Sequence, residues 1–267
     1  MEELLALLKN YQDLNLPEVV DYDKFNLYAI THHSTFLEGS TLTEIETQLL
    51  LEEGRTPKGK PLAHSLMVKD HHNALHFVLE KGRGRAAIKA ALVREINARV
   101  LKNTGSVYKT ALGEVDSSKG EYRLSNVRVG DRYFVAYNKV APLTEQLCSR
   151  LNQKLAEVDT VESQLLLSFD AHFDLVSIHP FYDGNGRTAR LLMNFIQAYF
   201  ELPLSIVFSE DKVDYFEALE KTRKKEDLSF FRDFMRAQYV KYLKSEIEKY
   251  LDAQDQPRKG DGFSFVF

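Results

Sequence analysis

The sequence has few of the features that mark secreted, membrane-spanning or nucleic-acid-binding proteins. One cysteine, Cys148, among 267 residues excludes an internal disulfide. The amino terminus carries two glutamates where a signal peptide needs basic residues, and the most apolar stretch, 191–208, is interrupted by polar residues and a proline. Basic and acidic residues nearly balance, 35 against 39, so the surface offers no general attraction to DNA or RNA. These absences predict a cytoplasmic protein in a reducing setting, with no membrane or nucleic-acid partner.

Glycine and proline are also sparse, and their distribution divides the chain into helical intervals. The 13 glycines and 7 prolines gather mainly around 54–61, 82–84, 105–130 and 180–186. Between them, apolar residues recur three or four positions apart, which predicts amphipathic helices over 66–79, 88–100, 166–178, 191–202 and 230–251. The length allows one large domain or two small ones. The fold class is therefore expected to be mainly α.

One segment departs from the helical period. Val127 and Val129, then Tyr133 and Val135, keep a period of two on either side of Gly130-Asp131. Alternating apolar residues around such a dipeptide are typical of a β-hairpin, so a short hairpin is expected within 121–137. Two strands are seldom stable alone, and the hairpin should therefore pack on the helices.

The segment 179–190 carries the richest chemistry: His-Pro-Phe-Tyr-Asp-Gly-Asn-Gly-Arg-Thr-Ala-Arg. Its glycines let the backbone approach an anion, and the helix that follows points free amide groups at the same spot. Arg187 and Arg190 share a face of that helix, while Asp183 precedes it as a carboxylate suited to a divalent ion. His179 titrates near neutrality and can accept a proton. The alternative is an ordinary helix-to-helix turn.

This segment resembles the signature of the Fic family, His-Pro-Phe-x-Asp/Glu-Gly-Asn-Gly-Arg-x-x-Arg, at every fixed position. The resemblance implies a Fic-type helical core that transfers AMP from ATP to a hydroxyl side chain of a protein. His179 would then be the general base and Asp183 the Mg²⁺ ligand. The anion cradle would be Gly184, Asn185 and Gly186, and Arg187 and Arg190 would hold the β- and γ-phosphates.

A second, shorter resemblance lies upstream, at Ser34-Thr35-Phe36-Leu37-Glu38-Gly39. It is similar to the inhibitory motif of one Fic class, Ser/Thr-x-x-x-Glu-Gly/Asn, in which the glutamate pairs with the second arginine of the signature. This implies a bidentate pair between Glu38 and Arg190 in the place of the ATP γ-phosphate. The alternative is a plain helix terminus, before a new helix capped within 40–44.

Two further resemblances concern substrate binding. The hairpin within 121–137 is similar to the Fic flap, which aligns an extended protein target by main-chain pairing. The segment 214–219 resembles one in which a tyrosine, here Tyr215, lies near the adenine, although Tyr215 fits a core position equally well. Both roles are expectations from the resemblance.

Together these features predict a Mg²⁺-dependent protein adenylyltransferase that uses ATP and is autoinhibited by Glu38. The expected parts are amino-terminal helices over 1–80, a Fic core over 81–225, and a carboxy-terminal helix and tail over 226–267. The protein target docks on the flap, and the chain itself is one candidate target. Alternatives are a Fic-fold enzyme that removes AMP or transfers another phosphate group, and a non-catalytic ATP-sensing regulator. Target, activating signal, oligomeric state and the role of the tail are left open.

Overall fold

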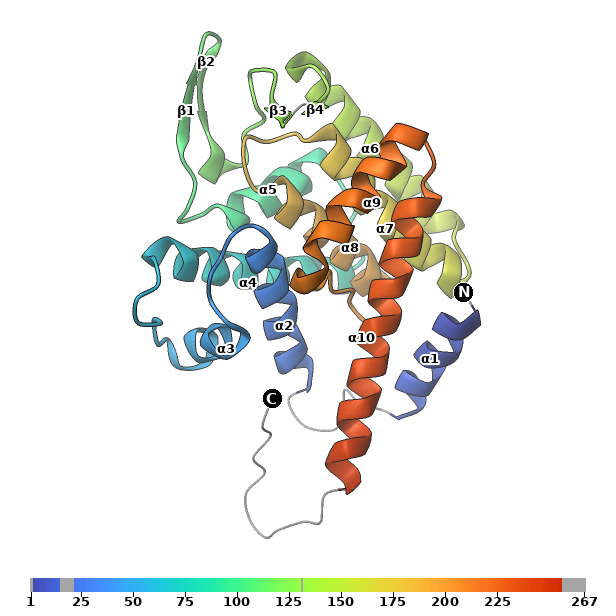
Figure 1. Ribbon diagram of the computed structural model, residues 1–267. Coiled ribbons are helices and arrows are strands. Elements are labelled where there is room, and N and C mark those ends of the chain that lie inside the picture. The colour runs from blue at the N-terminus through green and yellow to red at the C-terminus, as the bar shows by residue number, and fades with distance from the viewer. Residues whose placement is uncertain (1, 15–21, 131, 256–267) are drawn as a thin grey trace.

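The computed structural model describes residues 2–14, 22–130 and 132–255, and it is mainly helical as expected (Figure 1). The helices are α1 (Glu2–Asp13), α2 (Tyr22–Leu37), α3 (Glu44–Glu53), α4 (Leu62–Arg83), α5 (Ala90–Val100), α6 (Val140–Glu157), α7 (Val161–Ile178), α8 (Asn185–Tyr199), α9 (Lys212–Lys225) and α10 (Ser229–Asp255). The strands are β1 (Val107–Thr110), β2 (Gly113–Asp116), β3 (Arg128–Val129) and β4 (Arg132–Tyr133). Short 3₁₀ turns lie at Ser117–Lys119, Tyr137–Lys139 and Ser209–Asp211.

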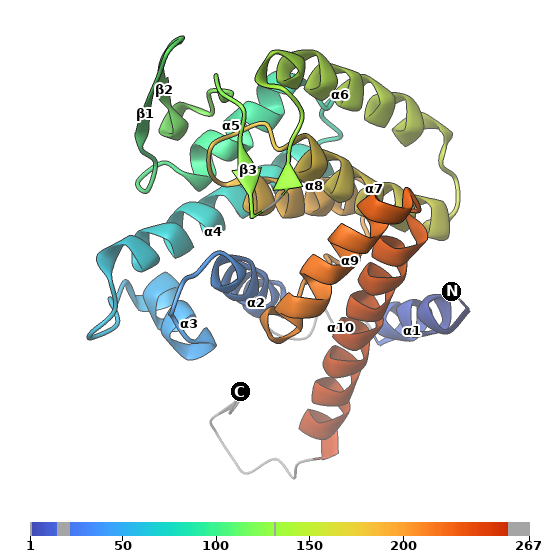
Figure 2. The ribbon, with the colours of Figure 1, turned by 45° about the horizontal axis from the view of Figure 1, so that its top comes forward.

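Helix α8 forms the centre of the core, with α4 and α7 packed along it (Figure 2). Apolar side chains all around α8, among them Leu192, Phe195 and Ile196, are buried. A helix that is buried on every face needs neighbours on every face. Gly82 of α4 allows the closest approach, because a Cβ there would lie 2.5 Å from the Phe195 carbonyl oxygen. The carboxy-terminal half of α8 is thereby held closely against α4.

Helix α2 lies beside α4 and reaches the amino-terminal end of α8. Its links to α4 are hydrogen bonds between hydroxyl and imidazole groups, Ser34 with His71 at 2.7 Å and Thr31 with His72 at 3.3 Å. After α2 the chain turns at Gly39, whose φ of 99° favours glycine. The new helix expected after 40–44 is confirmed as α3, which Thr43 caps in a capping box.

The hairpin expected within 121–137 is present, but its strands are short. Only two antiparallel pairs form, Arg128 with Tyr133 and Val129 with Arg132. One further cross-strand bond joins the Phe134 amide to the Val127 carbonyl at 3.2 Å, whereas the Arg123 amide, earlier in the segment, donates to the Pro180 carbonyl at 3.1 Å. The predicted hairpin is therefore present at the expected position, but its strands are shorter than the predicted segment.

A second hairpin, β1–β2, was not predicted. It pairs 107–110 with 113–116 in antiparallel register and stands on the same side of the molecule as β3–β4 (Figures 1 and 2). Its ring contact with the site is a stack of Tyr108 on Tyr182, with ring centroids 4.5 Å apart. The hairpin therefore borders the segment 179–190.

The two ends of the described chain meet on the far side of the core. Helix α1 packs against α10, with Tyr11 and Tyr242 rings 6.3 Å apart. Within the described residues, no helix combines the length and the apolar character that a membrane span requires. The tail whose role was left open, 256–267, lies outside the described residues.

Candidate active site

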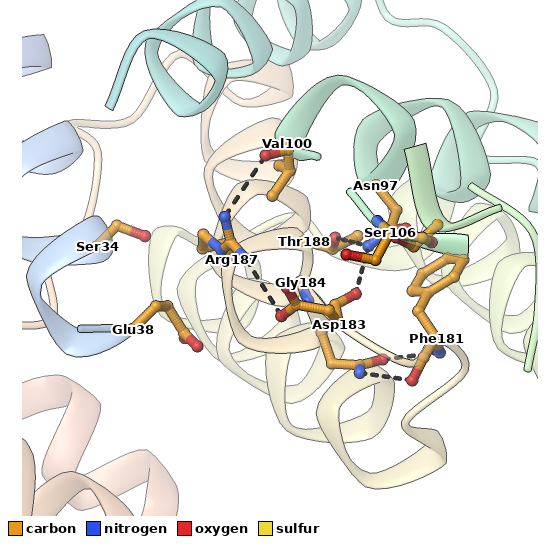
Figure 3. A network of polar contacts seen from close by, with 12 residues as sticks. Ser34, Glu38, Asn97, Val100, Ser106, Phe181, Asp183, Gly184, Arg187 and Thr188 are labelled. Atoms are coloured by element: carbon orange, nitrogen blue, oxygen red, sulfur yellow. Dashed lines mark hydrogen bonds and ion pairs between the residues drawn. The ribbon is translucent and has the colours of Figure 1, made fainter. Parts of the chain in front are cut away.

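The segment 179–190 forms the turn between α7 and α8 and continues into the first residues of α8. His179 ends α7 in the left-handed region, with φ 53° and ψ 61°, and its amide donates to the Leu175 carbonyl at 3.1 Å. The Asn185 side chain closes the turn, since it accepts from the Phe181 amide at 3.0 Å and donates to the Phe181 carbonyl at 2.9 Å (Figure 3). Asn185 therefore shapes the loop instead of pointing into an anion site with its amide group.

The Asn97 side chain of α5 donates hydrogen bonds to this segment, and the sequence did not reveal this role. Its Nδ2 donates to the Asp183 carbonyl at 3.0 Å and to the Thr188 hydroxyl at 3.1 Å (Figure 3). Gly184, with φ 77°, must lack a Cβ because that atom would lie 2.7 Å from the same Nδ2. The signal available in the sequence was an asparagine within the predicted helix 88–100, four residues from Val93 and four from Leu101, and the structure buries it fully.

Asp183 and Arg187 form one edge of the open end of α8. The Arg187 guanidinium donates to Asp183 Oδ1 at 3.3 Å and to the Val100 carbonyl at 3.5 Å, and its buried Nε has no partner among the described residues (Figure 3). Asp183 is 47% exposed, and Oδ1 also accepts from the Gly184 amide at 2.5 Å. The second carboxylate oxygen accepts no hydrogen bond from the described residues, so it can bind an ion.

Arg190 forms the other edge with residues from α2. Its Nη2 donates to Glu38 Oε1 at 2.7 Å and to the Ser34 carbonyl at 2.9 Å, while Nε donates to the Ser34 hydroxyl at 2.8 Å. The expected bidentate pair with Glu38 is thus wrong in detail, because Ser34 takes two of the guanidinium donors. Figure 3 shows Ser34 and Glu38 facing the signature segment from the α2 side.

The Glu38 carboxylate lies directly over the first turn of α8. A Cβ added to Gly186 would overlap Glu38 Oε1, so glycine at this position makes the approach possible. An anion at this place faces free backbone amides and the positive end of the helix dipole. Two segments far apart in sequence, 34–39 and 179–190, therefore meet at the amino-terminal end of α8.

The comparisons with known proteins match this geometry. A profile of the Fic/DOC family matches residues 87–197, which include α8 and the whole signature. The chain is a Fic/DOC family protein. It is 32% identical over 190 residues to Protein adenylyltransferase Fic of Aedes aegypti, a match that covers 71% of this chain and 36% of that protein. It is 31% identical over 232 residues to Protein adenylyltransferase fic-1 of Caenorhabditis briggsae, covering 85% of this chain and 41% of that protein.

A solved structure shows the same fold over nearly the whole Fic chain. A Fic domain containing signaling protein from Bacteroides thetaiotaomicron superposes with a TM-score of 0.80 at 23% identity, covering 97% of this chain and 100% of that one. The chain spans less than half the length of the two curated relatives named above.

The charges in this Fic site reinforce the contact between α2 and α8. Burial alone would raise the pKa of Glu38, but the neighbouring charges of Arg190 and Arg187 outweigh burial and lower it. Burial and the same two arginines hold the pKa of His71 well below its usual value, so this histidine is neutral beside Ser34. Glu38 is therefore ionised in its contact with Arg190, although 27% of its side chain remains exposed.

Tyr215 lies in the core behind Arg190. It is only 2% exposed, and its hydroxyl lies 3.0 Å from His172 Nε2. A hydrogen bond to Arg190 also acts on the pKa of this phenol, which burial raises. This placement favours the core alternative for Tyr215 over a place beside the adenine, and it gives the ring a part in holding Arg190.

His179 is enclosed by the flap of the Fic domain. The Phe134 ring stacks on the imidazole at 3.8 Å with an angle of 24° between the rings. Burial, and after it the charges of Arg123 and Arg132, lower the pKa of His179 to about 4. The imidazole is therefore neutral near pH 7, as a proton acceptor must be.

Proposed function

We propose that the chain transfers AMP from ATP to a hydroxyl side chain of a protein target. The observation that carries this proposal is a neutral His179 on the same rigid turn as an anion position at the amino-terminal end of α8. The hydroxyl oxygen would form a bond to the α-phosphorus while the bond to the bridging α,β-oxygen breaks. His179 would take the hydroxyl proton, and pyrophosphate would leave. The names of the curated relatives support the same reaction.

The phosphate-binding roles follow from the positions of the two arginines. Arg187 and Arg190 flank the anion position, and the buried Nε of Arg187 still lacks a hydrogen-bond acceptor among the described residues. A triphosphate would supply such an acceptor and replace the Glu38 carboxylate at Arg190. Catalysis would then consist mainly of holding the α-phosphorus in line with the hydroxyl.

The Mg²⁺ role is assigned to Asp183. Its exposed second oxygen fits a hard cation, and the described residues contain no group of three or more histidine, cysteine or carboxylate side chains that would bind a metal alone. Phosphate oxygens and water would complete the ligand set. A bound Mg²⁺ neutralises charge that develops on the leaving phosphates. The side chains of Asp183 and Arg187 stay linked through Oδ1.

The resting state proposed for this enzyme is autoinhibited. The ionised Glu38 occupies the arginine donor that the γ-phosphate needs, and Ser34 holds the same guanidinium in place. ATP bound without that donor would have its α-phosphorus out of line for attack. The parts of the chain follow this division: regulatory helices over 1–80, the core over 81–225 and the carboxy-terminal part over 226–267. The proposed setting is the cytoplasm, and the protein target docks on the flap.

Label transfer tests this function. The purified chain, alone and added to a cell lysate, is incubated with Mg²⁺ and ATP labelled either in the α- or in the γ-phosphate. We expect protein-bound label from α-labelled ATP only. Transfer of the γ-label would indicate phosphoryl transfer, and ATP binding with no covalent product would indicate a sensor. Release of AMP from a modified protein would indicate the reverse activity.

Asp183→Ala is expected to lower AMP transfer about a hundredfold or more and to remove its dependence on Mg²⁺, since this carboxylate is the proposed protein ligand. The measurement is the initial rate of label incorporation across a Mg²⁺ titration. Asp233→Ala serves as the control, because Asp233 is an exposed carboxylate paired with Arg236. Unchanged Mg²⁺-dependent turnover in Asp183→Ala would place the metal elsewhere.

A further inference from the structure

Arg123 is a buried arginine that joins the flap to the turn of His179. It is 1% exposed, and its guanidinium donates to three backbone carbonyls. Nε donates to His179 at 2.8 Å, Nη1 donates to Ser125 at 2.9 Å, and Nη2 donates to Val135. The Arg123 amide adds a fourth bond, to the Pro180 carbonyl at 3.1 Å. One residue therefore contacts both arms of the flap and the end of α7.

Burying a guanidinium group costs hydration free energy, and a short hairpin can form without that cost. Arginine is almost never fully buried unless it is paired, yet among the described residues no carboxylate contributes to the pKa of Arg123, and its guanidinium donates to backbone carbonyls. Burial accordingly lowers the pKa of Arg123. The three carbonyl acceptors replace part of the lost hydration. A two-stranded hairpin on the surface does not need a buried arginine. We therefore look for the role of Arg123 in the two segments that it connects.

Arg123 connects the proposed base, His179, to the flap, which is the proposed docking edge for the target. His179 has a left-handed backbone conformation that is uncommon for a residue with a side chain, and Arg123 binds the carbonyl of that residue. From the flap, Phe134 stacks on the imidazole, and Ser125 meets the Tyr182 hydroxyl at 2.8 Å. The distance from the flap to the imidazole is thus set through Arg123.

We propose that Arg123 is a positioning residue that holds the flap and His179 in one fixed arrangement, so that a target strand on the flap presents its hydroxyl to the imidazole. The inference rests on the proposed function. Geometry explains the choice of arginine, because its planar fork reaches three acceptors in fixed directions and a lysine ammonium cannot. A displacement of about 1 Å between reacting groups can lower a rate on the order of a hundredfold.

The test compares Arg123→Met and Arg123→Lys with the control Arg94→Met. Arg94 donates through Nε to the Gly120 carbonyl at 2.9 Å and lies over the Tyr122 ring at the start of the flap segment, so it supports that backbone without contacting the strands β3 and β4 or His179. Self-modification with α-labelled ATP is measured in the wild-type and Glu38→Gly backgrounds. Amide hydrogen exchange of the flap and of α8 is measured on the same samples.

We expect Arg123→Met to lower kcat about a hundredfold while the KM for ATP changes less than about twofold, because the α8 anion position is untouched. Exchange should rise in 124–137 and stay unchanged in α8. Arg123→Lys should recover the melting temperature but less than a tenth of the lost kcat. Arg94→Met should leave the kinetic constants and the flap exchange unchanged.

Other results separate the failure of this inference from the failure of the function. Equal flap exchange and a kcat within threefold of the parent in Arg123→Met would overturn the positioning role. A joint loss of ATP affinity and of α8 protection would overturn it too, since that marks a general folding defect. If Arg123→Met does not fold, the same criteria apply to Arg123→Lys. If no parent chain incorporates label, the proposed function fails, while flap exchange still decides whether Arg123 holds the flap.

Discussion

Glu38→Gly should raise the initial rate of AMP transfer on the order of a thousandfold, the scale of one arginine contact in a phosphoryl-transfer site. The substitution removes the carboxylate at Arg190 Nη2 and clears the space above Gly186. The freed arginine can then bind the γ-phosphate and orient the α-phosphorus. The measurement is incorporation of α-label at fixed ATP and Mg²⁺, with circular dichroism to check folding.

Three further variants test whether the gain arises from the contact between Glu38 and Arg190. Glu53→Gly is the control, because Glu53 is an exposed carboxylate at the end of α3 that pairs with Arg55. Adding Arg190→Ala to Glu38→Gly should cancel the gain, since the freed donor is then absent. Ser34→Ala should give a smaller gain, because it releases one side of the guanidinium but leaves the carboxylate. A folded Glu38→Gly protein no faster than wild type would refute the inhibitory role and leave the catalytic proposal intact.

His179→Ala should lower AMP transfer by about two to four orders of magnitude, the usual effect of losing a general base. ATP binding should persist, because Arg187, Arg190 and the first turn of α8 hold the phosphates. Transfer is measured in the Glu38→Gly background, where the starting rate is highest, and binding is measured by calorimetry. His76→Ala is the matched control, since His76 is an exposed histidine whose ring contacts are with His72 on α4.

The pH dependence gives an independent check on the same residue. A base must be neutral to act, and the pKa of His179 is lowered to about 4. A depressed pKa keeps the imidazole neutral down to lower pH, so kcat/KM should stay constant from pH 8 to about 5 and fall only below that range. A bend near the usual histidine value of about 6.5 would contradict this placement of the base.

Sequence reasoning found the parts whose signals are local. The apolar stripes around the signature predicted α7 and α8, and the run from His179 to Arg190 indicated the anion position because it packs glycines, a carboxylate and arginines into one turn. The link from Glu38 to Arg190 came from resemblance alone, since nothing in the spacing of two residues 152 positions apart predicts contact. Ser34 was part of that motif, but its share of the guanidinium was not foreseen.

The missed features depend on tertiary contacts. Asn97 and Arg123 are polar residues that each donate to the distant segment 179–188, and a sequence pattern shows that a residue is polar without showing its partner. The β1–β2 hairpin was not predicted because β1 alternates only between exposed and half-buried residues and β2 buries a single residue, Val115, so the period-two signal is weak. For Tyr215 the sequence left two alternatives, a core position and a place beside the adenine. Only its contacts with His172 and Arg190 distinguish them.

The stack of Phe134 on His179 has a consequence for the end of the catalytic cycle. With ring centroids 3.8 Å apart, no water fits between the rings, and the imidazole cannot turn while the flap stays in place. In the proposed reaction, the target hydroxyl would approach an imidazole nitrogen in the plane of the ring, where its lone pair lies. If the modified residue fills that approach, the base would lose its proton to solvent only after the product leaves the flap. The opening rate of the flap would then set an upper limit on turnover.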